Sequence, residues 1–315
     1  MDEERYREAE TAFWAAYGLE PAERRVRLAT TGTEVRVQIV GEGPPVLFLH
    51  GGPNAGTTWA PIVGAFEGCT RLVVDRPGTG LSEPWPAIVE RSNLERFADR
   101  FVADVLDGLG IERAHVVASS LGGYLALRSA AATPERFHRM VQMACPAFAP
   151  GMRTPPFMRL MSMGWFRRFT GLFPPNEKVG DVILRQIGHG ASLDAGRIPQ
   201  AFKDWYLDLQ RYTETMEHDG ELIGSVVSIR GFDPALTLSD ELLAAVATPT
   251  LFLWGEDDAF GGREVAERLV ELVPGASLVV LPRAGHLPWL DDPEGIGRRA
   301  RDFLVGAEDL QPGTR

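Results

Sequence analysis

The chain has 315 residues, of which 44% are hydrophobic and 24% charged, and its formal net charge at pH 7 is −11. This length allows one large core, and the acidic balance argues against nucleic acid or an anionic membrane as the main partner, because both favour clustered Lys and Arg. Two cysteines, Cys69 and Cys145, form neither a disulfide framework nor a metal-ligand pattern. We expect no cofactor and no metal.

The first 22 residues predict a helical extension of unknown role, because Phe13 and Tyr17 are spaced among many charges. The beginning Met1-Asp2-Glu3-Glu4 is unlike a signal peptide, and no apolar run approaches twenty residues. A cytoplasmic protein is therefore expected.

Residues 23–146 and 239–305 predict a single core, because short apolar runs alternate there with helical patterns. Such alternation is typical of a parallel sheet covered by helices. The apolar run 45–49 is followed by His50-Gly51-Gly52-Pro53, where glycines let the main chain approach a substrate. We expect the N–H of Gly52 to stabilise an oxygen that becomes negative in a reaction.

A serine between a strand-like run and a helix-forming run is the predicted nucleophile. Such a serine adopts a strained turn, which requires small residues two positions away on each side. Ser120 has Ala118 and Gly122 at those positions, whereas Ser119 has two bulky residues there. The chain therefore predicts Ser120 as the nucleophile and the N–H of the next residue, Leu121, as a second oxyanion donor.

Residues 147–238 predict a helical insertion, because the alternation stops and Met, Phe, Trp, Pro and Arg dominate. Most of these apolar residues are expected to pack the insertion itself. Methionine and aromatic side chains also fit irregular apolar ligands, so we expect Met158, Met161, Trp165 and Phe169 to line the substrate pocket. The substrate is predicted to be a small molecule with an apolar portion.

The acid and the base of a catalytic triad are predicted at two later strand ends. The run 250–254 leads into Gly255-Glu256-Asp257-Asp258, where the Gly-x-x-Asp offset favours Asp258 and leaves Asp257 as an alternative. His286 follows the run 277–280 on a turn and is the predicted base, while the other five histidines are expected to be structural. Residues 306–315 predict a frayed tail.

These motifs together resemble those of α/β-hydrolase fold proteins, from about residue 25 to 305. They are the segment 50–53, the turn from Asp75 to Ser82, the elbow at Ser120, the segment 255–258 and Gly285-His286. The order serine, acid, histidine belongs to this architecture. The resemblance implies an eight-stranded, mostly parallel sheet flanked by helices, with a helical lid inserted after the sixth strand. It also implies that Asp75 forms a structural turn.

At several positions this sequence differs from the patterns of particular α/β-hydrolase subfamilies, and these differences disfavour some activities. A serine at position 120 disfavours haloalkane dehalogenases and epoxide hydrolases, which have aspartate there. Proline-iminopeptidase-like enzymes typically have tryptophan after the nucleophile, where this chain has Leu121. Their lid glutamates hold a substrate amine, and Glu214, Glu217 and Glu221 are candidates, although a solvated helix face explains them better. Meta-cleavage hydrolases tend to have tryptophan directly after the histidine, whereas this chain has Leu287 there and Trp289 two residues later.

The main hypothesis is a serine hydrolase that cleaves an ester-type or related acyl bond through an acyl-enzyme. The same residues would serve a carbon–carbon bond hydrolase or an aminopeptidase-like enzyme. A hypothesis of another class is a small-molecule receptor, or a biosynthetic acyltransferase or cyclase, on the same fold. The sequence predicts neither the substrate nor the oligomeric state.

Overall fold

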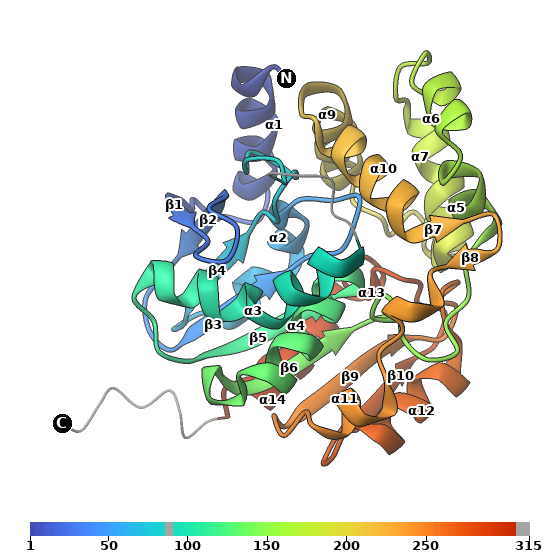
Figure 1. Ribbon diagram of the computed structural model, residues 1–315. Helices are drawn as coiled ribbons and strands as arrows, with labels where there is room; N and C mark the ends of the chain where they lie inside the picture. Colours follow the sequence, from blue (N-terminus) through green and yellow to red (C-terminus); the bar gives the residue numbers. More distant parts are fainter. Residues whose placement is uncertain (86–90, 307–315) are drawn as a thin grey trace.

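One mixed sheet forms the centre of the computed structural model, which describes residues 1–85 and 91–306 (Figure 1). Its strand order is β1-β2-β4-β3-β5-β6-β9-β10. The strands are β1 (Ala22–Arg27), β2 (Glu34–Val40), β3 (Pro45–Leu49), β4 (Thr70–Val74), β5 (Ala114–Ser119), β6 (Phe137–Met143), β9 (Thr250–Gly255) and β10 (Ser277–Leu281). Among the described strands of this sheet, the pairings β1–β2 and β2–β4 are antiparallel and the others are parallel. The predicted eight-stranded, mostly parallel sheet is confirmed.

Helices cover the sheet, as the apolar strands require. Every residue of β5 is buried, which is typical of a central parallel strand that is packed on both faces. The helices α3 and α4 pack against each other, and α2 and α14 pack against each other. The covering helices are α2 (Ala60–Val63), α3 (Arg91–Leu109), α4 (Ser120–Ala132), α11 (Asp240–Ala244), α12 (Arg263–Leu272), α13 (Pro288–Asp291) and α14 (Pro293–Leu304).

The segment between β6 and β9 is largely helical, where the sequence predicts an insertion. Its elements are α5 (Pro156–Met161), α6 (Gly164–Thr170), α7 (Glu177–Leu184), α8 (Gly190–Asp194), α9 (Gln200–Tyr212), α10 (Thr215–Val226) and the short pair β7 (Val227–Ser228) and β8 (Gly231–Phe232). We call residues 147–238 the inserted segment. Its action as a lid stays a prediction.

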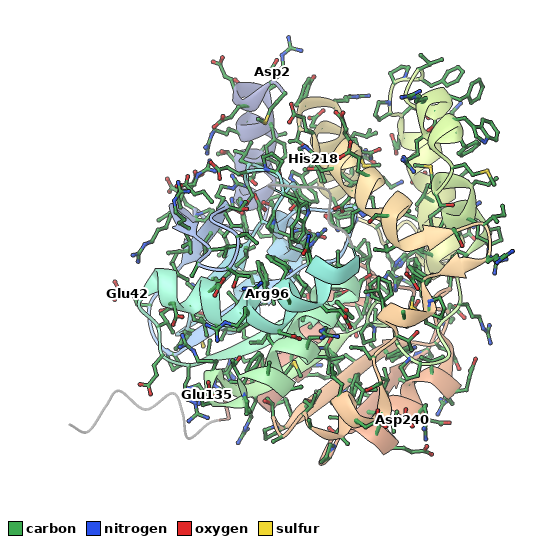
Figure 2. The ribbon with its side chains drawn as sticks, viewed as in Figure 1. Asp2, Glu42, Arg96, Glu135, His218 and Asp240 are labelled. Atoms are coloured by element: carbon green, nitrogen blue, oxygen red, sulfur yellow. The ribbon has the colours of Figure 1, made fainter. Side chains whose placement is uncertain are left out.

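The N-terminal helix α1 (Glu3–Ala15) packs against α9 of the inserted segment (Figure 1). The ring of Phe13 stacks on Trp205 with centroids 5.2 Å apart. Asp2 lies at the outer end of α1 (Figure 2). Its N–H donates to the carbonyl of Tyr212 at 2.8 Å. The predicted N-terminal extension is thus a helix that contacts the inserted segment. Of the predicted tail, residues 307–315 lie outside the described residues.

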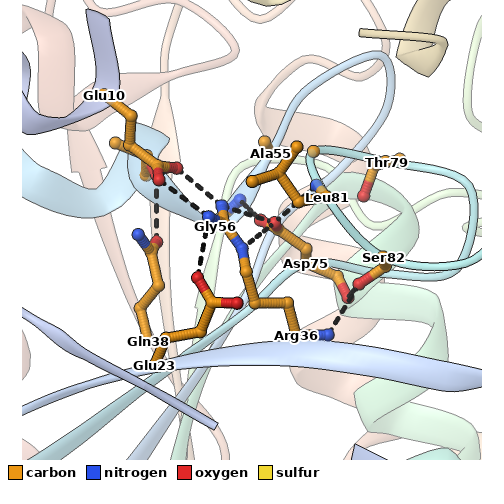
Figure 3. A network of polar contacts seen from close by, with 12 residues as sticks. Glu10, Glu23, Arg36, Gln38, Ala55, Gly56, Asp75, Thr79, Leu81 and Ser82 are labelled. Atoms are coloured by element: carbon orange, nitrogen blue, oxygen red, sulfur yellow. Dashed lines mark hydrogen bonds and ion pairs between the residues drawn. The ribbon is translucent and has the colours of Figure 1, made fainter. Parts of the chain in front are cut away.

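A buried polar network joins α1 to the sheet (Figure 3). Arg36 of β2 donates from Nη1 and Nη2 to Glu10 of α1, at 2.7 and 2.6 Å, and from Nε to Asp75 at 2.8 Å. Asp75 also accepts the N–H groups of Gly56 and Leu81. Burial raises the pKa of Asp75, against the opposing charge of Arg36. These contacts hold the turn after β4.

None of the helices in the described parts of the chain has the length and apolar character needed to cross a membrane.

Candidate active site

The residues predicted for catalysis follow the carboxyl ends of four parallel strands. Leu49 of β3 pairs with Ala118 of β5, which brings the segment 50–53 beside Ser120. Strands β9 and β10 are neighbours in the same sheet, and the loops that follow them contain Asp258 and His286. In open α/β sheets, ligands bind outside these strand ends.

Ser120 has the strained backbone that its neighbours predict. Its φ is +53°, in the left-handed region that an L-residue rarely adopts. A Cβ on Gly122 would lie 2.3 Å from the carbonyl oxygen of Leu49, so glycine is required there. A Cβ on Gly51 would lie 2.6 Å from the Cβ of Ser120 and 3.1 Å from its Oγ. The glycine loop therefore passes directly beside the serine.

Asp258 and His286 are in contact. Nδ1 of His286 lies 2.9 Å from Oδ2 and 3.0 Å from Oδ1 of Asp258. The carboxylate also accepts the N–H groups of Cys145 and Phe260, both at 2.9 Å, so its position is fixed from three directions. Asp258 is buried and Asp257 is exposed, so Asp258 is the carboxylate of this loop that His286 meets.

Three consecutive backbone N–H groups fix the loop of His286. The N–H of Gly285 donates to Asp291 Oδ2 at 2.9 Å, and that of His286 donates to the carbonyl of Ile187 at 2.9 Å. The N–H of Leu287 donates to Nε2 of His189 at 3.0 Å. Nδ1 of the buried His189 lies 2.9 Å from Asp291 Oδ2. Two of the three acceptors thus come from the inserted segment.

His189 is one of the five histidines expected to be structural, and its contact with the loop of His286 is not predicted by the sequence. Gly188 precedes it with a φ of +104°, and a Cβ there would lie 2.2 Å from the carbonyl oxygen of Asp257. This glycine, inside a helical stretch, was the one local signal of a close approach.

Buried polar contacts also fix the glycine loop 50–53. Arg76 donates from Nε to the carbonyl of His50 at 3.1 Å and from Nη2 to that of Gly51 at 2.9 Å. Nη2 also donates to Asp219 Oδ2 of α10 at 3.0 Å. The hydroxyl of Tyr206 in α9 donates to the carbonyl of Pro53 at 3.1 Å. The inserted segment therefore touches the loop that supplies Gly52.

Two of these buried groups have shifted pKa values. Burial raises the pKa of Asp219, and the neighbouring Arg76 opposes that shift. Burial, together with the charge of Arg76, lowers the pKa of His50 well below its ordinary value. The contacts of His50 suit the neutral ring, because Nδ1 donates to the carbonyl of Gly51 and Nε2 accepts the N–H of Arg76.

The predicted oxyanion donors belong to two segments, the loop after β3 and the start of α4. Gly52 belongs to the loop that Arg76 fixes, and a Cβ there would lie 2.4 Å from Asp219 Oδ2. Leu121 lies in the first turn of α4 and is buried. That their N–H groups bind an oxyanion stays a prediction.

The residues predicted to line the pocket are spread over two helices of the inserted segment. Met158 and Met161 in α5 are half-buried. Trp165 and Phe169 in α6 are exposed, at 66% and 54%. Such exposure does not suit an enclosed pocket, and a substrate-binding role for the four stays a prediction.

The structure also describes the surroundings of the glutamates and of the tryptophan that the sequence comparison with related families singled out. Glu214, Glu217 and Glu221 are all exposed, as a solvated helix face requires. The indole of Trp289 is buried and lies on Trp59, with centroids 4.3 Å apart.

The chain is similar to proteins with the alpha/beta hydrolase fold. A family model described as the alpha/beta hydrolase fold matches residues 44–293. A 2-hydroxy-6-oxononadienedioate/2-hydroxy-6-oxononatrienedioate hydrolase of Cupriavidus pinatubonensis is 28% identical, over 89% of this chain and 94% of the relative. Carboxylesterase YbfK of Bacillus subtilis is also 28% identical, over 84% of this chain and 81% of the relative. The crystal structure of that carboxylesterase superposes with a TM-score of 0.73 and 23% identity, over 97% of this chain and 99% of the other.

Proposed function

This chain belongs to the α/β-hydrolase fold family, and on that premise we propose that it is a serine hydrolase that cleaves an ester-type or related acyl bond of a small, partly apolar substrate. One arrangement of side chains at the strand ends carries the proposal. Ser120, with its left-handed backbone, lies beside Gly51, while His286 is held by Asp258.

In the acylation step, Nε2 of His286 takes the proton of the Ser120 hydroxyl as its oxygen attacks the substrate carbonyl. Asp258 accepts Nδ1–H of His286, which leaves Nε2 as the basic nitrogen. The N–H groups of Gly52 and Leu121 stabilise the oxyanion of the tetrahedral intermediate. The bond from carbonyl carbon to leaving group breaks, and His286 returns its proton to the leaving group.

Deacylation repeats these steps with water as the nucleophile. His286 takes a proton from water, the hydroxide attacks the acyl carbon, and the proton returns to Ser120 as the carboxylic acid leaves. An alcohol in place of water would give acyl transfer by the same steps, so the ratio of transferred acyl product to free acid, measured at a low alcohol concentration, distinguishes a transferase from a hydrolase.

A second candidate is hydrolysis of a carbon–carbon bond in a diketone, which is supported by the similarity to the dienedioate hydrolases. An acyl bond is favoured because Leu287 follows the histidine and Trp289 is committed to packing on Trp59. The similarity to a carboxylesterase also supports the acyl bond.

Labelling with a fluorophosphonate tests the nucleophile without knowledge of the substrate. The probe should form an adduct on Ser120, which peptide mass mapping would locate. Ser120→Ala should abolish the adduct, while Ser119→Ala, which changes a buried neighbouring hydroxyl, should retain it. A folded protein without an adduct on Ser120 would overturn the proposal. Acyl esters and diketones of increasing size would then separate the two candidates.

A further inference from the structure

The helices α6 and α7 and the turn between them expose a run of large apolar side chains. We call this the outer patch, and its members are Trp165, Phe169, Leu172, Phe173, Val179 and Val182. Leu172 is 77% exposed, and the rings of Phe169 and Phe173 contact each other edge to face, with centroids 5.4 Å apart. In Figure 1, α6 and α7 stand at the edge of the molecule, on the far side of α9 and α10 from α1. Apolar surface of this kind marks an interaction site.

The surroundings of the outer patch are cationic, although the whole chain is acidic. From the end of β6 to Asn176 the sequence contains four arginines and no Asp or Glu. Among the described residues, Arg159, Arg168 and Lys178 are exposed and have no carboxylate partner. The acidic side chains of α7, Glu177 and Asp181, lie 3.4 and 2.8 Å from Nζ of Lys203. Arg167 is turned inward and donates to the carbonyl of Met161.

We propose that the outer patch docks on an anionic lipid surface. Trp, Phe and Leu beside Arg and Lys are the residues that place a short amphipathic segment at the boundary between headgroups and acyl chains. The rings and aliphatic side chains would enter that boundary, while Arg159, Arg168 and Lys178 would meet anionic headgroups. This proposal is independent of the bond that the active site cleaves.

The charge distribution favours a lipid surface over a second copy of the chain. In a two-fold symmetric dimer, the same patch faces itself. The unpaired cations of one copy would then meet those of the other, with no free carboxylate of the patch to neutralise them. An anionic lipid surface supplies negative headgroups for the cations and an apolar layer for the exposed rings and aliphatic side chains.

Vesicle sedimentation tests the proposal. The wild-type protein should sediment with vesicles of phosphatidylcholine and phosphatidylglycerol in equal parts at low ionic strength. It should bind far less to phosphatidylcholine alone, and added salt should release it. The double variant Trp165→Ser/Phe169→Ser should lose binding. Arg159→Gln/Arg168→Gln, which removes two positive charges, should lower the partition coefficient about thirtyfold.

Matched controls make the outcome decisive. Ile229→Ser removes an equally exposed apolar side chain outside the patch, at 57% exposure, and should bind as the wild type does. Trp165 is the only exposed tryptophan of those described, so lipids brominated in the acyl chains should quench wild-type fluorescence and not that of Trp165→Phe. Wild-type protein that stays in solution with anionic vesicles, or equal loss in Ile229→Ser, would overturn the proposal. So would a dimer in sedimentation equilibrium that the double serine variant dissociates.

Discussion

His189 accepts the backbone N–H of Leu287 through its Nε2, at a distance of 3.0 Å. The acceptor belongs to the inserted segment and the donor directly follows the proposed catalytic base. An accepting Nε2 means that Nδ1 carries the proton, and Nδ1 lies 2.9 Å from Asp291 Oδ2. The position of the base thus depends on a side chain that lies 97 residues earlier in the sequence.

Replacement of His189 by leucine should lower kcat about a hundredfold and change KM little, because a small displacement of the base misaligns the proton transfer. His189→Gln should retain most of kcat, since its amide oxygen can accept the N–H of Leu287. Steady-state kinetics on an ester substrate would measure both. Equal losses in the two variants would show that His189 only fills space.

Replacement of Asp258 by asparagine should lower kcat by about four orders of magnitude, because the amide no longer holds Nδ1–H of His286. The neighbouring Asp257→Asn is the matched control, since that side chain is exposed, and it should act as the wild type does. Rates of fluorophosphonate labelling would give the same comparison without a known substrate. The reverse order of effects would make Asp257 the acid.

Replacement of Asp219 by alanine should lower the free energy of unfolding by about 3–5 kcal/mol, because it leaves the buried guanidinium of Arg76 without its carboxylate partner. The exposed Glu217→Ala on the same helix should change it by less than about 0.5 kcal/mol. Urea unfolding followed by circular dichroism would measure both. Similar values for the two variants would contradict the role given to the buried pair.

The lowered pKa of His50 predicts a loss of stability in acid. The folded protein keeps this ring neutral, whereas the unfolded chain binds a proton below about pH 6.5. The unfolded state therefore gains protons first, and the free energy of unfolding falls by about 1.4 kcal/mol per pH unit below that point, from this group alone. In His50→Asn, the slope of unfolding free energy against pH should be smaller by that amount. An unchanged slope would show that His50 titrates alike in both states.

The sequence predicted those features that depend on neighbouring residues. The apolar runs identified the strands, and the small residues around Ser120 indicated a strained turn that the φ of +53° confirms. The motifs at the ends of β3, β5, β9 and β10 converge because parallel strands end at one edge of the sheet. The contact of His286 with Asp258, rather than with Asp257, agrees with the offset that favoured it.

Contacts between distant segments could not be predicted in this way. Asp219 meets Arg76, and His189 meets Leu287, only because the inserted segment folds back over the strand ends. Local composition gives no signal for such partners. The exposure of Trp165 and Phe169 also could not be predicted, because the apolar side chains of a helix in an insertion can face either the site or the solvent.

The position of Glu10 has a practical consequence for anyone who trims this chain. The family match begins at residue 44, and the sheet begins at Ala22 with β1. A protein shortened to the sheet would keep every strand and every proposed catalytic side chain, yet Arg36 would lose one of its carboxylates and Trp205 its stacking partner Phe13. A minimal version of the enzyme should therefore begin ahead of α1, because the family match that starts at residue 44 leaves out a helix that packs on the inserted segment and is joined to the sheet.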